Sequence, residues 1–170
     1  MTAQADFKGR LGETAAAFLA LRPAALAGEP WPLATVFDDS DEAEWGPPEV
    51  LAHVAEMLPY WLGEVERIVA ASPASVPFGR VPTDPVRLAI IGRDRSVPVR
   101  ELLDRIESDI ARYQRRLDGL TTADLASVGL HPRRGPVTVG EVLERFVVAH
   151  LAEHAAQLRE LLGARSEAGG

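Results

Sequence analysis

Apolar residues recur at steps of three and four in four separate stretches of the chain, which is the spacing of an amphipathic helix. The stretches cover residues 2–21, 47–71, 98–117 and 139–162. Each is long enough to present an apolar face along its whole length. The pattern therefore predicts four long helices that bury these faces against one another.

Residues that start, stop or bend helices support this interpretation. Pro23 ends the first helix, and Ser96 is placed to cap the third. Thr138 and Glu141 form a capping box at the start of the fourth. Pro59 lies inside the second helix, where the missing N–H predicts a kink.

Two long connections, residues 22–45 and 72–97, separate the helices, and no strand-like alternation is present. Residues 129–136 are expected to form a loop, and a loose tail is expected from about residue 164. The prediction is a single all-α domain over residues 1–170, a four-helix bundle with two long connections. The first connection carries an acidic run of Asp38, Asp39, Asp41, Glu42 and Glu44. It is expected to be a solvated loop, and the alternative for a loop of this length is a lid or another functional segment.

Two of the four histidines lie in the middle of the apolar stripe of the last helix. His150 and His154 are one turn apart, so both imidazoles point from the same face and can reach one metal ion. His53, at the edge of the stripe of the second helix, is the natural third partner from a facing helix. Three imidazoles leave a fourth position open, and zinc, nickel or iron suits such ligands. The alternative is that these are core histidines hydrogen-bonded to neighbouring groups.

Acidic and amide side chains lie close to the predicted histidines in the sequence. Glu56 follows His53 by one turn, and Glu153 and Gln157 flank the histidine pair. Each can orient a ligand, and Glu56 is the candidate catalytic proton acceptor. The alternative for all three is a solvated helix surface, which is the better interpretation for Glu153.

The segment before the last helix offers a candidate anion site. Arg133 and Arg134 lie close to the start of that helix, where they can bind an anionic group of a cofactor or substrate. A solvated loop is the competing interpretation. His131, two residues earlier, is expected to be a loop residue.

The last helix also matches a second metal-binding motif. His150, Glu153 and His154 match the H-x-x-E-H pattern of inverted zinc peptidases. Those enzymes need a further acidic ligand well downstream. Glu160 and Glu167 are the nearest acids here, on the same helix or in the tail, so the peptidase interpretation is disfavoured.

Composition narrows the possible partners. The net charge is -7 and no cluster of basic residues is present, which disfavours nucleic-acid binding. The absence of cysteine excludes disulfides and thiolate ligands supplied by the chain itself. No run approaches the ~18 apolar residues of a membrane span, and the N-terminus lacks the apolar core of a signal peptide. A cytoplasmic protein without membrane contact is expected.

Two longer sequence segments resemble a known family. WGPPEVLAHVAEMLPYW around His53 and RRGPVTVGEVLERFVVAHLAEHAAQL around His150 and His154 resemble the DinB-like superfamily. That group includes DinB/YfiT-type proteins and the N-terminal domain of mycothiol-dependent maleylpyruvate isomerase. The resemblance implies a four-helix bundle, often a homodimer, with a divalent metal bound by His53, His150 and His154.

The same resemblance implies a range of activities. Some members transfer sulfur-linked groups with a low-molecular-weight thiol such as mycothiol or bacillithiol, and many have no established reaction. We therefore expect a metal-dependent thiol transferase or isomerase acting on a small molecule. The alternative is a non-catalytic, stress-associated metal-binding bundle that works through dimerisation.

Overall fold

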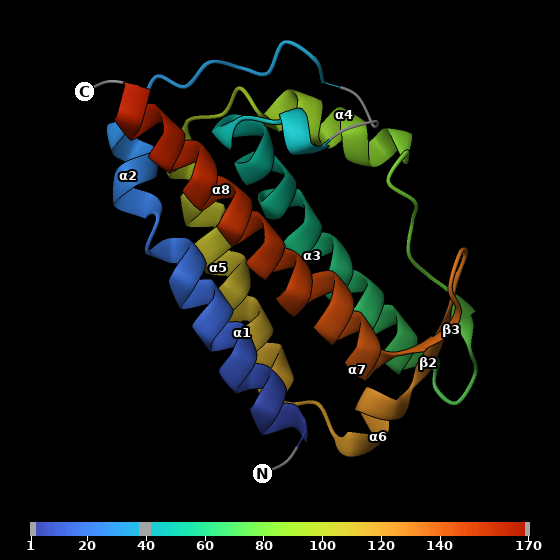
Figure 1. Cartoon of the computed structure of the whole chain (residues 1–170). Coiled ribbons are helices and arrows are strands. Elements are labelled where there is room, and N and C mark those ends of the chain that lie inside the picture. Colours follow the sequence, from blue (N-terminus) through green and yellow to red (C-terminus); the bar gives the residue numbers. More distant parts are fainter. Residues whose placement is uncertain (1–2, 38–41, 169–170) are drawn as a thin grey trace.

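The computed structural model describes residues 3–37 and 42–168, and its main body is a four-helix bundle (Figure 1). The all-α bundle expected from the sequence is therefore confirmed. The last long helix, α8, is preceded without a break by a short helix, α7, and then by a π-helical turn, η2. The helices of the bundle are α1 (Ala3–Leu19), α3 (Pro47–Ala71), α5 (Val99–Asp118) and α7, η2 and α8 in succession (Val139–Val142, Leu143–Val148 and Ala149–Ala168).

The direction of the helices explains one of the long connections. α3 packs against α5 and α8, and α1 packs against the same two helices on the other side. α1 and α8 run one way along the bundle, and α3 and α5 run the other way (Figure 1). Because α3 and α5 are neighbours that run in parallel, the chain between them must return along the length of the bundle.

This return segment, residues 72–98, has structure of its own. It contains a two-residue strand, β1 (Val76–Pro77), and a helix, α4 (Pro85–Asp94). The carboxylate of Asp84 caps α4 by accepting a hydrogen bond of 2.9 Å from the Arg87 N–H. The apolar stretch at residues 86–91 is therefore helical.

A small sheet lies at the end of the bundle beside the start of α7. β2 (Val128–His131) and β3 (Gly135–Thr138) form an antiparallel hairpin, and β1 pairs in parallel with β2. The prediction of a loop over residues 129–136 was wrong, because most of these residues belong to the hairpin. Strands of four residues are too short to show a clear alternation, and Gly135, at a φ of 71°, supplies the turn that joins them.

Several helix boundaries also differ from the sequence prediction. Pro23 occupies the first turn of an additional helix, α2 (Arg22–Ala27), which begins where a connection was expected. Pro98, not Ser96, precedes the first residue of α5. α8 continues to Ala168, past the expected start of the tail. The capping box of Thr138 and Glu141 is confirmed, with backbone N–H contacts of 3.2 and 2.9 Å. The remaining short helices are η1 (Glu42–Glu44) and α6 (Thr122–Ala126).

The π-helical turn changes which residues of the last helix face the core. A π-turn contains an extra residue, so the apolar face shifts relative to an unbroken α-helix. Beyond η2 the buried positions include Leu151, Leu158 and Leu162, whereas Leu161 is only partly buried. His154 remains on the buried face, with 4% of its surface exposed.

A buried carboxylate fastens the first connection to the bundle. Glu49 in the first turn of α3 is fully buried and accepts hydrogen bonds from the N–H groups of Ala34 and Gly46, at 2.9 and 3.1 Å. The guanidinium of Arg95 completes its contacts at 3.2 Å. Each hydrogen bond that the Glu49 carboxylate accepts offsets part of the free-energy cost of burying its charge. The connection that carries η1 is thereby held against α3.

Pro59 lies within α3, which continues on both sides of it. Tyr113 of α5 donates a hydrogen bond of 2.7 Å to the Leu58 carbonyl immediately before the proline. Burial raises the pKa of Tyr113 well above its ordinary value. The hydrogen bond therefore ties α5 to α3 next to the proline and gives the buried hydroxyl a partner. None of the described helices is long and apolar enough to cross a bilayer.

Replacement of Tyr113 by phenylalanine is expected to lower the free energy of unfolding by about 1–3 kcal/mol, because it removes the buried hydrogen bond to the Leu58 carbonyl. Urea denaturation followed by circular dichroism measures the loss. Tyr60→Phe is the matched control, since the Tyr60 hydroxyl forms no hydrogen bond with the described residues and its ring is half-buried. Equal losses in the two variants would contradict a special role for the Tyr113 hydroxyl.

Candidate metal centre

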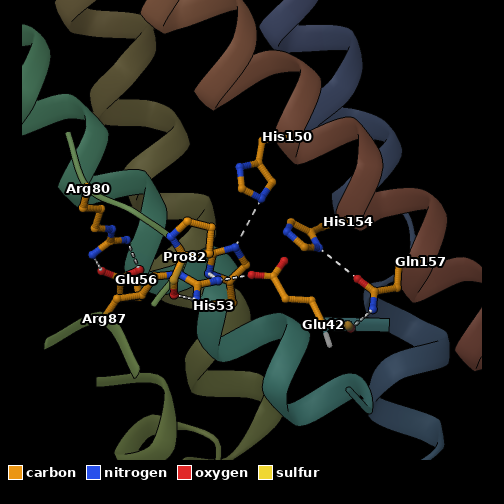
Figure 2. A network of polar contacts seen from close by, with 9 residues as sticks. All are labelled: Glu42, His53, Glu56, Arg80, Pro82, Arg87, His150, His154 and Gln157. Atoms are coloured by element: carbon orange, nitrogen blue, oxygen red, sulfur yellow. Dashed lines mark hydrogen bonds and ion pairs between the residues drawn. The ribbon is translucent and has the colours of Figure 1, made fainter. Parts of the chain in front are cut away.

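The packing of α3 against α8 brings three histidines together. His53 lies in the second turn of α3, and His150 and His154 lie in the first two turns of α8. The ring centroids are 5.2 Å apart for His53 and His150, and 4.7 Å apart for each of the other two pairs. Figure 2 shows the three rings converging from the two helices. These are the three residues that the sequence singled out as metal ligands.

The nitrogen atoms are already close to the spacing that a metal requires. Nε2 of His53 and Nε2 of His150 are 3.3 Å apart. Zinc–nitrogen bonds of about 2.0–2.1 Å in a tetrahedral site separate ligand atoms by roughly 3.4 Å. Without a metal, the same contact is a hydrogen bond between one protonated and one unprotonated nitrogen.

A chain of hydrogen bonds sets the orientation of His154. The Gln157 side-chain N–H donates to the backbone carbonyl of Glu42 at 2.7 Å, which leaves its amide oxygen to accept from Nδ1–H of His154 at 3.0 Å. With its proton on Nδ1, His154 has a free lone pair on Nε2. That nitrogen is buried and has no hydrogen-bond partner among the described residues. An unpaired buried lone pair is costly, and a metal ion bound there removes the cost.

The charge state of the cluster also fits a metal. Burial, followed by the neighbouring His154 and Arg87, keeps the pKa of His53 well below its ordinary value. Burial and the same two neighbours lower the pKa of His150 to about 3. Burial likewise lowers the pKa of His154. The three imidazoles are therefore neutral near pH 7, which is the form that binds a divalent cation.

The fourth member of the cluster is Glu42, from the short helix η1. One of its carboxylate oxygens and one nitrogen from each of the three histidines all lie within 4.8 Å of one another. The prediction of a solvated loop was wrong for Glu42, because its side chain lies against the histidines and is only about one-third exposed. Its backbone carbonyl is fixed to α8 by Gln157. Asp38, Asp39 and Asp41 of the same acidic run lie outside the described residues.

Arg87 of α4 lies against two members of the cluster. It forms an ion pair with Glu42, and its guanidinium is 3.5 Å from Nδ1 of His53 (Figure 2). Because a guanidinium only donates, this contact favours a proton on Nε2 of His53. Metal binding through that Nε2 moves the proton to Nδ1 and weakens the contact. At 3.5 Å the contact is at the upper limit of a hydrogen bond, so little is lost.

Glu56, the candidate proton acceptor, is engaged elsewhere. Its two carboxylate oxygens each receive a hydrogen bond of 2.5 Å from the Arg80 guanidinium, and both side chains are almost fully buried. Arg80 also covers the ring of Tyr60 at 3.8 Å. Glu56 is not one of the four residues whose ligand atoms converge. The geometry gives it a direct role in holding Arg80.

A pocket of about 390 Å³ opens beside the histidines. Arg133 and Arg134, the candidate anion-binding residues, line it together with His53 and His150. His131 lines it as well, at the end of β2 and not in a loop. No pattern in the sequence pointed to Arg80 and Arg87, which line the same pocket from the return segment.

The remaining candidates lie apart from the converging atoms. Gln157 orients His154, as the sequence suggested, whereas the Glu153 side chain is exposed on α8. Glu160 is also exposed, and it is not among the four clustered residues. The acidic ligand that the inverted peptidase motif needs is therefore not supplied by Glu160.

Replacement of His150 or His154 by alanine is expected to abolish binding of about one equivalent of divalent metal, because two imidazoles hold an ion much less tightly than three. Untagged protein is incubated with zinc or nickel, desalted and analysed by inductively coupled plasma mass spectrometry. His131→Phe is the control, since it removes an imidazole outside the cluster. Full metal content in His150→Ala would show that the histidines are core residues only.

Replacement of Glu42 by glutamine is expected to lower metal affinity by about 10- to 100-fold, since it removes the carboxylate beside the three imidazoles. Competition with a chromogenic chelator measures the dissociation constant. Glu44→Gln is the matched control, because Glu44 lies in the same short helix with its side chain exposed. Equal affinities in the two variants would leave Glu42 only as the partner of Arg87.

The fold has a counterpart among solved structures. A structure of YfiT from Bacillus subtilis aligns with a TM-score of 0.71 at 17% sequence identity, covering 96% of this chain and 87% of that one. YfiT is described as a probable metal-dependent hydrolase with an unusual four-helix bundle topology. At this identity the likeness shows the fold alone. No curated protein sequence matches the chain.

A family model gives a more direct assignment. The model of the DinB superfamily matches residues 2–158, a range that includes all three clustered histidines and the bundle helices except the C-terminal half of α8. The match agrees with the resemblance carried by the segments around His53, His150 and His154. The chain therefore belongs to the DinB superfamily.

Proposed function

We propose that this protein is a divalent-metal-dependent enzyme that uses a low-molecular-weight thiol of the mycothiol or bacillithiol class. The reaction is transfer to, or isomerisation of, a small electrophilic molecule. The observation that carries the metal site is the unpaired Nε2 of His154, buried beside two other neutral imidazoles and a carboxylate. The thiol is supported by the resemblance to family members that use one.

The pocket supports a reaction with a bound small molecule. It is continuous with the cluster, because His53 and His150 line both. A volume of about 390 Å³ accommodates a small molecule and not water alone. Trp61 and Phe146 form part of its wall and exclude water from the side facing the bundle.

The residues of the chain have separate tasks in this proposal. The three histidines would hold a divalent ion, which when bound would lower the pKa of a thiol or water beside it. A carboxylate oxygen of Glu42 is placed to accept the released proton, with Arg87 holding the carboxylate in position. Gln157 keeps the proton of His154 on Nδ1. We assign Glu56 to positioning Arg80 at the pocket wall.

Hydrolysis is the second candidate function. It is favoured by the nearness of the Glu42 carboxylate to the histidines, since a carboxylate beside a metal can accept a proton from water. The description of YfiT as a probable metal-dependent hydrolase points the same way. Here water replaces the thiol as the nucleophile, and the protein residues keep the same tasks.

Metal-loaded protein is expected to consume a chlorinated dinitrobenzene in the presence of mycothiol or bacillithiol, and His150→Ala is expected to lose this activity by at least about 100-fold. Absorbance of the thioether product measures the rate. In parallel, the cobalt-substituted protein is expected to show a sulfur-to-cobalt charge-transfer band when the thiol is added. Arg159→Gln, an exposed change on α8, serves as the control.

The outcomes separate the candidates. Turnover of an activated ester without thiol, lost in His150→Ala, would replace thiol transfer by hydrolysis. Tight metal binding with neither reaction and no charge-transfer band would favour the non-catalytic metal-binding bundle. Light scattering of the same samples tests the homodimer that the family resemblance implies.

A further inference from the structure

The mouth of the pocket carries positive charge without matching carboxylates. Arg80 and Arg87 are neutralised by their ion pairs with Glu56 and Glu42. Arg133 and Arg134 also line the pocket, and neither forms an ion pair with a carboxylate in the part of the chain that the structure describes. The pocket therefore keeps two uncompensated guanidinium groups at its opening.

The hairpin fixes where these two arginines lie. They occupy the turn between β2 and β3, where His131 pairs with Gly135 across the hairpin. β2 is held to the bundle by β1, and the Phe78 N–H donates to the Leu130 carbonyl at 3.1 Å. The turn is therefore carried by a small sheet and not by a free loop.

His131 provides a second, independent sign of a ligand. Its Nδ1 accepts a hydrogen bond of 3.2 Å from the Arg133 N–H. Burial, and then the nearby Arg134, lower the pKa of His131, so the ring is neutral, and its proton is on Nε2 because Nδ1 accepts. The nearby backbone carbonyl of Arg80 attracts this proton and opposes the lowering of the pKa. His131 is only 7% exposed, yet none of the described groups, the Arg80 carbonyl included, meets Nε2 with the geometry of a hydrogen bond.

The position of His131 is closely set by its neighbours. A side-chain carbon added at Gly79, which has a φ of 80°, would lie 2.5 Å from Cδ2 of His131, so the glycine leaves room for the ring. The ring stacks on Phe146 with centroids 5.4 Å apart and planes at 14°. Trp61 stacks on Phe146 in turn, at 4.4 Å and 12°. The donor is therefore part of an ordered aromatic wall of the pocket.

We propose that the pocket binds a small organic anion whose carboxylate or phosphate group is held by Nε2–H of His131 and by the guanidinium groups of Arg133 and Arg134. Its apolar body lies against Trp61 and Phe146. A buried donor without a partner and two unpaired cations at one opening are the combination that an anionic oxygen satisfies. Only the orientation of the molecule, with its reacting end toward His53 and His150, rests on the proposed function.

Isothermal titration of the full chain with benzoate, phenyl phosphate and benzamide tests the assignment. Benzamide has nearly the shape of benzoate but no charge. One of the two anions is expected to bind at least about tenfold more tightly than benzamide. The tighter of the two identifies the carboxylate or the phosphate as the group recognised.

Variants locate the binding. Replacement of both Arg133 and Arg134 by glutamine is expected to weaken anion binding by about tenfold or more, and His131→Phe, which keeps a ring in the stack, by about three- to tenfold. Arg159→Gln removes one exposed charge elsewhere and is expected to change nothing. Both arginines are exposed, so the double variant keeps the test valid even where His131→Phe fails to fold.

Two results would overturn the proposal. One is equal affinity for benzoate, phenyl phosphate and benzamide, or unchanged anion binding in the double arginine variant. The other is loss of anion binding when the metal is removed by a chelator, since this would place the anion on the metal. Retained binding without metal supports the subsite, whatever reaction the metal centre performs, so failure of thiol transfer would leave this result standing.

Discussion

The gathering of three neutral imidazoles at the contact of α3 with α8, with His53 and His154 buried and His150 partly exposed, is the constraint on which the rest of the site depends. Each buried ring nitrogen needs a partner, and the described residues supply partners for all but Nε2 of His154. A core built for stability alone would place apolar side chains at these positions, because unpaired buried polar atoms are destabilising. The cluster is therefore best explained as a site whose ligand atoms are already arranged for a metal ion.

The supporting contacts come from segments that do not belong to the bundle core. Glu42 reaches the histidines from the first connection and Arg87 from the return segment, whereas Arg134 lines the adjoining pocket from the hairpin. Glu49 fastens the first connection, and the pairing of β1 with β2 fastens the hairpin. The bundle thus supplies the histidines, and the connections supply the charged groups around them.

The sequence was sufficient for the four long helices and for the pair of His150 and His154, because both follow from helical periodicity. His53 was added from its place on a facing helix and from the family resemblance. Glu42 could not be recognised, since it lies in an acidic run without periodicity and its position depends on the tertiary contact between Gln157 and its backbone carbonyl. The hairpin was missed because its strands are four residues long. The π-helical turn was missed because a regular spacing of 100° per residue assumes an unbroken α-helix.

The parallel arrangement of α3 and α5 has a consequence for how such a site can diversify. The chain must cross the length of the bundle between them, and this obligatory crossing lies over the pocket and carries Arg80 and Arg87. Insertions, deletions and substitutions in a surface crossing are tolerated far better than changes in a packed helix. Proteins with the same bundle can therefore acquire different ligand preferences through sequence changes in the segment that corresponds to residues 72–98 and in the hairpin, while the helices that carry the histidines are kept.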